Sequence, residues 1–497
     1  MKILHASSEL HPYSKSGGLA DMAGALAKSL AALGHQVGVV TPLHRGIREK
    51  FPALKKFDWQ IDLPLGSRRV TAEVWTLQPS AGHTIYFIDQ PEFFNRPGLY
   101  GTQGADYPDN AERFVFFSKC IAQLARHLPW RPELVHLHDW QTGLVPLLVK
   151  HGEQFEGWAS PPRTCLTIHN LAYQGIFPRA AYALTNLPED YFHPEGAEFY
   201  GSCNCLKAGL NFADRLTTVS PRYAREITTE ANGCGLDGTL RRRQGVLTGI
   251  LNGVDYDEWN TTANPALAHP YSADDLAGKA LGKAALQSEM GLPVDANVPL
   301  FGTITRLAEQ KGVDIELGAL TEMLAGPMQF ILLGSGSPEF EKACSNLARR
   351  FPDQVAVKIG FDQTLSHRIE AGLDFYLMPS RFEPCGLNQM YSLRYGTIPI
   401  VRVTGGLDDS VTDISENEET CNGIKFLEYS QRALAMAMRK ALVLYQTPEL
   451  FAHFRRNAMA ADFSWEQTSL RYIGCYEQAL FAGTVQEAAG RRGRTRA

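Results

Sequence analysis

The sequence predicts an α/β protein made of two doubly wound domains. Short apolar runs alternate with helical segments along the whole chain, and most of these runs are continuously apolar. Continuous apolar runs are typical of parallel strands that are buried on both faces of a sheet. The 497 residues exceed what one hydrophobic core supports, so we expect two domains of roughly 200–250 residues each.

The order of these runs predicts the individual elements. The expected strands are 2–7, 36–42, 84–89, 134–139, 164–170 and 215–220 in the first half, and 298–306, 329–334, 355–360, 375–380 and 397–403 in the second. Leucine and methionine at helical spacing predict a helix directly after the first strand.

The domain boundaries are expected where the composition changes. The segment 241–265 is rich in Arg, Gly and Asn and separates the two alternating patterns, and the segment 462–480 has a helical pattern. We therefore expect an N-terminal domain at 1–245 and a C-terminal domain at 246–458. A final helix at 459–482 is expected to pack back towards the N-terminal domain, followed by a disordered tail at 483–497.

The composition excludes several classes of protein. The 48 basic and 53 acidic residues give a net charge of −5, which does not fit a nucleic-acid-binding surface. Nine cysteines without C-x-x-C spacing favour a reducing compartment over a disulfide framework or a structural zinc site. The N-terminal residues read as a strand, and no apolar run approaches the ~18 residues of a membrane span, so we expect a cytoplasmic protein without a signal peptide.

The sequence KSGGLAD from Lys15 is the first candidate binding motif. It joins the first strand to the first helix through Gly17 and Gly18, and it matches neither G-x-G-x-x-G nor the P-loop. A glycine turn at a helix N-terminus suits an anion, because free N–H groups and the positive end of the helix dipole converge there. The alternative is a glycine-rich structural turn with a solvated Lys15.

Parallel strands present their functional loops at their carboxyl ends. That rule selects Glu9 and Lys15 after the first strand, and it also selects the ends of the later strands. Those later residues are Asp139 with Trp140, His169 with Asn170, Arg306 with Lys311, Phe361, Glu383, and Gly405 with Gly406.

Arg306 and Lys311 follow a buried strand in TRLAEQKG. A planar guanidinium and a compact ammonium at one strand end suit a diphosphate. The alternative is a pair of solvated cations, although cations are unfavourable at a helix start.

Glu383 lies in SRFEPCGL, between a strand and a helix. Its carboxylate can accept hydrogen bonds from sugar hydroxyls, or it can simply complement the helix dipole. Cys385 is close to the same helix start, where a thiol pKa can fall, although an inert cysteine is the alternative. Gly405 and Gly406 form a second glycine turn that suits a phosphate or a sugar.

The aromatic and polar candidates each have a structural alternative. Trp140 can stack on a sugar or lie in the core, and Asp139 can bind hydroxyls or cap a helix. His169 can bond to a sugar hydroxyl or serve the fold, and Phe361 can stack on a nucleobase or simply pack.

Taken together, these segments closely resemble bacterial glycogen synthases and plant starch synthases. The resemblance rests on KSGGLAD, LHDWQTG, TIHNLAYQG, GILNGVD, TRLAEQKG, SRFEPCGLNQMYSLRYGTIPIV and TGGLDDSV, and it extends from Met1 to about residue 480. It implies a GT-B fold, in which two Rossmann-like domains face each other across a deep cleft. It also implies transfer of glucose from ADP-glucose to the non-reducing end of an α-1,4-glucan such as glycogen, with retention of configuration and with no cofactor or catalytic metal.

The resemblance also implies roles for single residues. Glu383, Arg306, Lys311, His169 and Asp139 become the catalytic set. The implied acceptor contacts are Glu9, Asp139, Trp140 and Asn170. The implied ADP-glucose contacts are Lys15, Gly17, Gly18, Asp21, Arg306, Lys311, Phe361, Cys385, Gly386, Leu387, Gly405 and Gly406.

The sequence departs from the wider GT-B pattern at one position. Many retaining members carry a second glutamate eight residues after the first, where this chain has Tyr391. The alternatives that stay open are a UDP-glucose-preferring synthase, a glucan phosphorylase or hydrolase, and a glucan-binding protein without activity. The oligomeric state is open as well.

Overall fold

The structure is a computed structural model that describes the backbone of residues 1–102 and 104–494, with side chains up to Phe481. It divides the chain into two compact units. Unit 1 comprises 1–219, 224–253 and 465–497, and unit 2 comprises 220–223 and 254–464. None of the described helices is both long and apolar enough to cross a bilayer.

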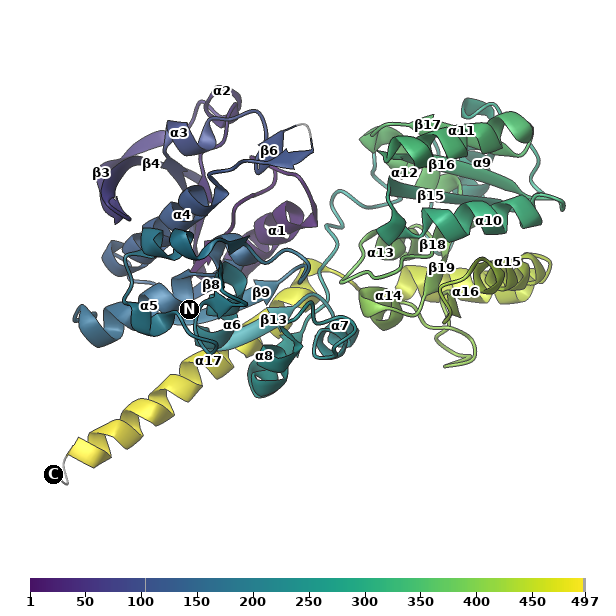
Figure 1. Cartoon of the computed structure of the whole chain (residues 1–497). Coiled ribbons are helices and arrows are strands. Elements are labelled where there is room, and N and C mark those ends of the chain that lie inside the picture. Colours follow the sequence, from purple (N-terminus) through teal and green to yellow (C-terminus); the bar gives the residue numbers. More distant parts are fainter. Residues whose placement is uncertain (103, 495–497) are drawn as a thin grey trace. The chain divides into compact units, whose positions relative to one another are not determined.

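Unit 1 is built on a nine-stranded sheet with the order β14-β13-β9-β8-β1-β2-β5-β4-β3. Figure 1 labels β3, β4, β8, β9 and β13 of this sheet. Its strands are β1 (Lys2–Ala6), β2 (Gln36–Pro42), β3 (Lys55–Leu65), β4 (Arg68–Ser80), β5 (His83–Asp89), β8 (Leu134–His138), β9 (Arg163–Ile168), β13 (Arg215–Thr218) and β14 (Leu247–Gly249). Short strands form two small sheets: β6 (Gly101–Thr102) with β7 (Ala105–Asp106), and β10 (Ile176–Phe177) with β11 (Glu198–Phe199) and β12 (Ser202–Asn204).

The helices of unit 1 connect these strands. They are α1 (Gly18–Ala32), α2 (Ile47–Lys50), α3 (Pro91–Phe94), α4 (Asn110–His127), α5 (Val145–Phe155), α6 (Cys205–Phe212), α8 (Asp237–Arg242) and α17 (Trp465–Arg494). The 3₁₀ turns are η1 (Trp140–Thr142), η2 (Arg179–Thr185), η3 (Glu189–Tyr191) and η4 (Gln244–Val246). The helix α7 (Pro221–Glu226) contains residues of both units.

One face of the unit 1 sheet is covered by α1 and α17. Leu26 and Leu30 of α1 pack in the same buried cluster as Tyr472 and Tyr476 of α17 and the strand residue Val39. The expected return of the C-terminal helix to the first domain therefore has a counterpart in α17, which begins at Trp465.

Unit 2 contains a six-stranded parallel sheet with the order β17-β16-β15-β18-β19-β20. Its strands are β15 (Leu300–Leu307), β16 (Gln329–Gly336), β17 (Val355–Ile359), β18 (Phe375–Met378), β19 (Ile398–Arg402) and β20 (Ile424–Phe426). Its helices are α9 (Ala277–Glu289), α10 (Val313–Met323), α11 (Pro338–Arg350), α12 (Gln363–Gly372), α13 (Asn388–Arg394), α14 (Gly405–Ser410), α15 (Gln431–Tyr445) and α16 (Pro448–Ala460), with the 3₁₀ turn η5 (Glu309–Lys311).

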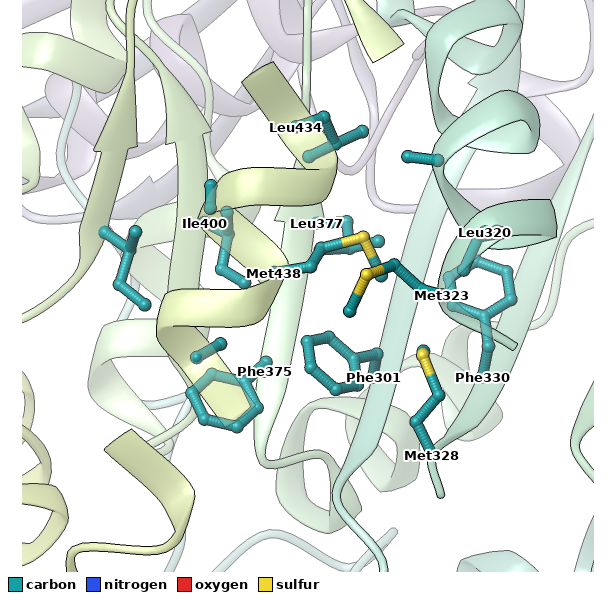
Figure 2. Packing of buried hydrophobic residues seen from close by; sticks show 14 of the residues in the cluster. Phe301, Leu320, Met323, Met328, Phe330, Phe375, Leu377, Ile400, Leu434 and Met438 are labelled. Atoms are coloured by element: carbon teal, nitrogen blue, oxygen red, sulfur yellow. The ribbon is translucent and has the colours of Figure 1, made fainter. Parts of the chain in front are cut away.

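The two faces of this sheet bury alternate residues of each strand. Phe301 and Phe375 face the cluster built by α10, α11, α15 and α16, while their neighbours Leu300 and Tyr376 face the cluster of α9, α12 and α14. Figure 2 shows the first cluster, in which Met323 and Met438 point toward one another. Strands buried on both faces explain the continuous apolar runs of the sequence.

The structure differs from the sequence expectation in several places. The antiparallel strands β3 and β4 were not expected, because their alternation of buried and exposed residues lacks a continuous apolar run. The main part of the second unit runs from Val254 to Ser464, where 246–458 was expected, and residues 220–223 also belong to it. The helix α17 runs to Arg494, where a disordered tail from 483 was expected, because extending an existing helix needs no new nucleus; residues 495–497 of that tail lie outside the described residues.

Candidate functional site

The predicted site residues of unit 1 follow three neighbouring strands. In the sheet order, β9, β8 and β1 lie side by side. The next strand in sequence, β2, pairs with one edge of β1, and the later strand β8 pairs with the other edge. Such a switch point is where open α/β sheets bind ligands. The loops concerned carry Glu9 to Asp21 after β1, Asp139 and Trp140 after β8, and His169 and Asn170 after β9.

The buried carboxylate of Glu9 organises the loop after β1. It accepts hydrogen bonds from the Ser16 backbone N–H, from the Ser16 hydroxyl at 2.8 Å, from the Gly17 N–H at 3.2 Å and from the Tyr100 hydroxyl at 2.8 Å. The N–H groups of Ser16 and Gly17 therefore bond to Glu9, which holds the loop in place. The contact of Gly17 with a sugar nucleotide and the contact of Glu9 with an acceptor sugar stay predictions.

Gly17 and Lys15 remain accessible in this loop. Gly17 has an extended φ of −158°, and a β-carbon built on it would meet no atom within 4 Å. Neither backbone conformation nor local packing therefore requires glycine at this position. Lys15 is exposed, and its Nζ lies 2.8 Å from Asp21 Oδ1 in the first turn of α1.

Asp139 has a strained backbone and a buried side chain. Its φ of 55° and ψ of −169° lie in a region that glycine adopts almost alone. Its Oδ1 accepts the His169 N–H at 2.7 Å, and the Asn170 N–H also bonds to this carboxylate. Burial raises the pKa of Asp139 to about 7, against these two hydrogen bonds. Asp139 thus ties the loop after β8 to the loop after β9.

His169 is held by a second histidine. Its Nε2 lies 3.1 Å from Nδ1 of His138, the fully buried last residue of β8. Burial lowers the pKa of His169 to about 3, so the imidazole is neutral at physiological pH.

Two further predicted residues have local contacts. Trp140 packs edge-on against Phe114 and Phe177, with ring centroids 5.0 and 5.6 Å away, which favours the core alternative over sugar stacking. Asn170 accepts the Ala172 N–H at 3.0 Å through its side chain and so supports the turn that follows β9.

Unit 2 has its own switch point, at which β15 lies between β16 and β18. Lys311 follows β15 and Glu383 follows β18, and their side chains meet with Nζ 2.5 Å from Oε2. The Ser380 hydroxyl donates to the same Oε2 at 3.1 Å. Arg306 is exposed at the end of β15, where it donates to Gln310 Oε1 at 3.1 Å. Two cations and a carboxylate thus lie at one edge of this sheet.

The two glycines that start α14 are required by close packing. A β-carbon on Gly405, whose φ is +43°, would lie 1.9 Å from the carbonyl oxygen of Glu383, and one on Gly406 would lie 2.0 Å from that of Cys385. The Gly406 N–H donates to the Glu383 carbonyl at 3.2 Å. Glycine at these positions brings the loop after β19 against the loop that carries Glu383.

The remaining predicted contacts lie around this edge. Cys385 is buried, Gly386 has a φ of +72°, and Leu387 caps α13. Phe361 follows β17, two strands from β15, and 81% of its surface is exposed.

Tyr391 occupies the position where the wider pattern has a second acid. Its ring stacks on Trp259 with centroids 3.6 Å apart and planes within 5°.

Sequence reasoning missed three side chains of these sites. They are Tyr100, which holds Glu9, Ser380, which holds Glu383, and His138. His138 and Ser380 stand within three residues of a predicted site residue, so their position at strand ends offered a signal. Tyr100 lies 91 residues from Glu9 and gave none.

Among the described residues, His5, His136 and His138 form a group that could hold a metal ion, with ligand atoms within 4.8 Å of one another. Both ring nitrogens of His136 already have partners, however: Thr167 Oγ1 at 2.6 Å and the Tyr476 hydroxyl at 2.8 Å. The two remaining imidazoles are fewer than the three protein ligands of a catalytic zinc site.

Comparison with known proteins finds a matching family of enzymes for each half of the chain. Residues 2–242 match the family described as the starch synthase catalytic domain, and residues 290–459 match glycosyl transferases group 1. The glycogen synthase of Anaeromyxobacter sp. (strain Fw109-5) is 48% identical over 96% of this chain and 99% of its own length. The glycogen synthase of Syntrophotalea carbinolica is 44% identical over 97% and 99%.

Solved structures agree with the sequence relatives. The catalytic domain of starch synthase IV from Arabidopsis thaliana, bound to ADP and acarbose, matches with a TM-score of 0.86 and 32% identity over 96% of this chain and 99% of that one. Sucrose-phosphate synthase from Thermosynechococcus elongatus, 18% identical with a TM-score of 0.60, supports the fold alone. The predicted GT-B fold and the predicted resemblance are both confirmed, and the chain belongs to the glycogen and starch synthase family of glycosyltransferases.

Proposed function

We propose that this glycosyltransferase elongates an α-1,4-glucan of the glycogen type by transferring glucose from ADP-glucose with retention of configuration. The observation that carries the proposal is the Lys311–Glu383 pair at the switch point of unit 2, with Arg306 exposed at the same strand end. A starch synthase 32% identical to this chain was solved with ADP and acarbose, a nucleotide and a carbohydrate, which supports the same substrate classes here.

The departing diphosphate determines the role of the two cations, Lys311 and Arg306. Cleavage of a glucosyl diphosphate leaves an anion and gives the sugar oxocarbenium character. Lys311 and Arg306 accelerate this step because they stabilise the charge that grows on the departing diphosphate more than the charge of the bound substrate.

Glu383 binds the transferred sugar in this proposal. Both Lys311 and Ser380 bond to its Oε2, so Oε1 is the oxygen left to accept a sugar hydroxyl. A carboxylate held by an ammonium and a hydroxyl is a poor nucleophile, which favours attack of the acceptor on the face that the diphosphate leaves. The acceptor proton then passes to the departing phosphate. Isolation of a kinetically competent glucosyl-enzyme would reject this route.

The test is incorporation of labelled glucose into glycogen. We expect label from ADP-glucose in the polymer, released by an exo-hydrolase specific for α-1,4 bonds, and slower incorporation from UDP-glucose. Faster incorporation from UDP-glucose would reject the donor assignment. No label from either donor would favour a phosphorylase, a hydrolase or a binding protein.

Variants test the site itself. Lys311→Ala and Glu383→Ala should keep the unfolding temperature of the parent and lose about 10²–10³-fold in turnover. The exposed Lys342 on α11 is the matched control, and Lys342→Ala should be fully active. Parental activity in Lys311→Ala would overturn the assignment.

A further inference from the structure

The bond between His138 and His169 constrains where the protons of both rings lie. His138 has no exposed surface, and its Nδ1 faces Nε2 of His169 at 3.1 Å. Among the described residues, no atom hydrogen-bonds to Nε2 of His138. The ring is fixed from its other sides as well, since its plane stacks on His5 within 17° and its backbone N–H donates to Thr142 Oγ1 at 2.9 Å.

Two arrangements of the protons satisfy this geometry. If His169 donates from Nε2, then His138 carries its own proton on Nε2, where it is a buried donor without a partner. If His138 donates from Nδ1, then its Nε2 is only an unused acceptor. Buried orphan donors are rarer than under-satisfied acceptors, so the second arrangement is favoured.

The second arrangement determines what His169 presents to a ligand. Its Nε2 accepts from His138, so its single proton lies on Nδ1, which the described residues leave without a hydrogen-bond partner. The side chain is only partly buried, and burial lowers the pKa of both rings, so His169 is a neutral donor. A neutral donor can hold a sugar oxygen without placing a cation beside an oxocarbenium-like centre.

We propose that His138 is a positioning residue that fixes His169 as its Nδ1–H tautomer and directs that N–H to an oxygen of the transferred glucosyl group. The identity of the recipient rests on the proposed function above. The tautomer assignment does not rest on the proposed function, because it follows from contacts inside unit 1 alone.

Paired substitutions of His138 test the positioning role. Asparagine places an amide N–H near the position of Nδ1, whereas glutamine places it near Nε2. His138→Asn should therefore keep most of the turnover, and His138→Gln and His138→Leu should lower kcat about 10–100-fold, the size typical of losing a partner behind a functional group. KM for ADP-glucose should change less than kcat. Equal losses in all three variants would overturn the proposal.

A double-mutant cycle separates positioning from mere stability. In a His169→Ala background, His138→Leu should cost no further activity, because there is no ring left to orient. Phe87→Leu is the matched control: it removes a fully buried ring of β5 whose described ring contact is with Tyr13, so its effect should add independently. Full additivity of His138→Leu with His169→Ala would reject the role.

The tautomer of His169 can be determined by NMR, without measuring enzyme turnover. In protein labelled with ¹⁵N-histidine and free of substrate, Nδ1 of His169 should have the shift of a protonated nitrogen and Nε2 that of an unprotonated one, with His169→Gln used for assignment. A protonated Nε2 would overturn the proposal. If this readout succeeds while ADP-glucose transfer fails, the proposed function is wrong and the tautomer assignment survives.

Discussion

Asp139 combines a strained backbone with a buried carboxylate that accepts hydrogen bonds. Its φ of 55° and ψ of −169° cost free energy, and its carboxylate recovers part of that cost by holding the N–H groups of His169 and Asn170. The strained conformation places the carboxylate within hydrogen-bond distance of the backbone of the loop that carries His169.

Replacing Asp139 separates these two effects. Asp139→Gly and Asp139→Ala both remove the carboxylate, but only alanine retains the strain, so the glycine variant should unfold with a free energy about 1–2 kcal/mol higher than the alanine variant. Both should lose turnover to a similar extent. Urea denaturation and initial rates measure the two quantities. Equal stability of the two variants would contradict the strain.

Gly17 gives a second test at the scale of one residue. Its conformation and surroundings accept a methyl group, so Gly17→Ala should keep the stability of the parent or gain up to about 1 kcal/mol. If the absent β-carbon makes room for the diphosphate, KM for ADP-glucose should rise and kcat should fall. Gly245→Ala, also in open space, is the control and should behave as the parent. Unchanged kinetics of Gly17→Ala would show that the donor does not approach this turn.

At the scale of elements, the candidate site residues follow the ends of the strands, while the helices cover the faces of the sheets with apolar side chains. The helix α10 starts two residues after Lys311 and packs against the sheet through Val313, Leu320 and Met323. One of its buried residues is charged in water: Glu316, whose Oε1 has no hydrogen-bond partner among the described residues.

Glu316 makes the stability depend on pH. Burial raises its pKa from 4.5 to about 8. Below pH 4.5 the group is protonated in both states, and between pH 4.5 and about 8 the unfolded chain releases the proton that the folded chain keeps, so stability falls as pH rises. Glu316→Gln should therefore gain stability over the parent progressively across this window in urea denaturation. Glu339→Gln, an exposed first-turn residue of α11, should show no such trend.

At the scale of the whole molecule, the chain passes between the units four times: after Val219, after Tyr223, after Gly253 and after Ser464. Within unit 1 the last two passages are in contact, since Gly253 lies under the Trp465 ring and Thr468 Oγ1 donates to the Leu251 carbonyl at 3.2 Å. Within unit 2 the Val254 N–H donates to the Phe463 carbonyl at 2.7 Å.

Gly253 tests the importance of this junction. A β-carbon there would lie 2.6 Å from the Trp465 indole and 2.9 Å from its Cα, so Gly253→Val should destabilise the protein by about 1–3 kcal/mol. Thermal unfolding measures the loss, and Gly245→Val, in open space, is the control. An unchanged unfolding temperature would mean that Trp465 moves aside without cost.

Much of this protein could be predicted from its sequence because the signals are local. Continuous apolar runs gave the parallel strands, and polar residues directly after them gave Lys311, Glu383, Asp139 and His169 as site candidates. The strands β3 and β4 were not predicted, because their buried and exposed residues alternate. The strands β14 and β20 were not predicted either, because three residues are too few to form a recognisable apolar run.

The sequence by itself determined the fold class, the family and the strand ends that carry the candidate site residues. Only the tertiary structure decided how those side chains pair: Glu9 with Ser16, Gly17 and Tyr100, Asp139 with His169, His138 with His169, and Lys311 with Glu383. The reason is physical. Strand and helix patterns arise between near neighbours in the chain, whereas a hydrogen bond such as that from Lys311 to Glu383 joins residues 72 positions apart, and only the folded sheet brings them together.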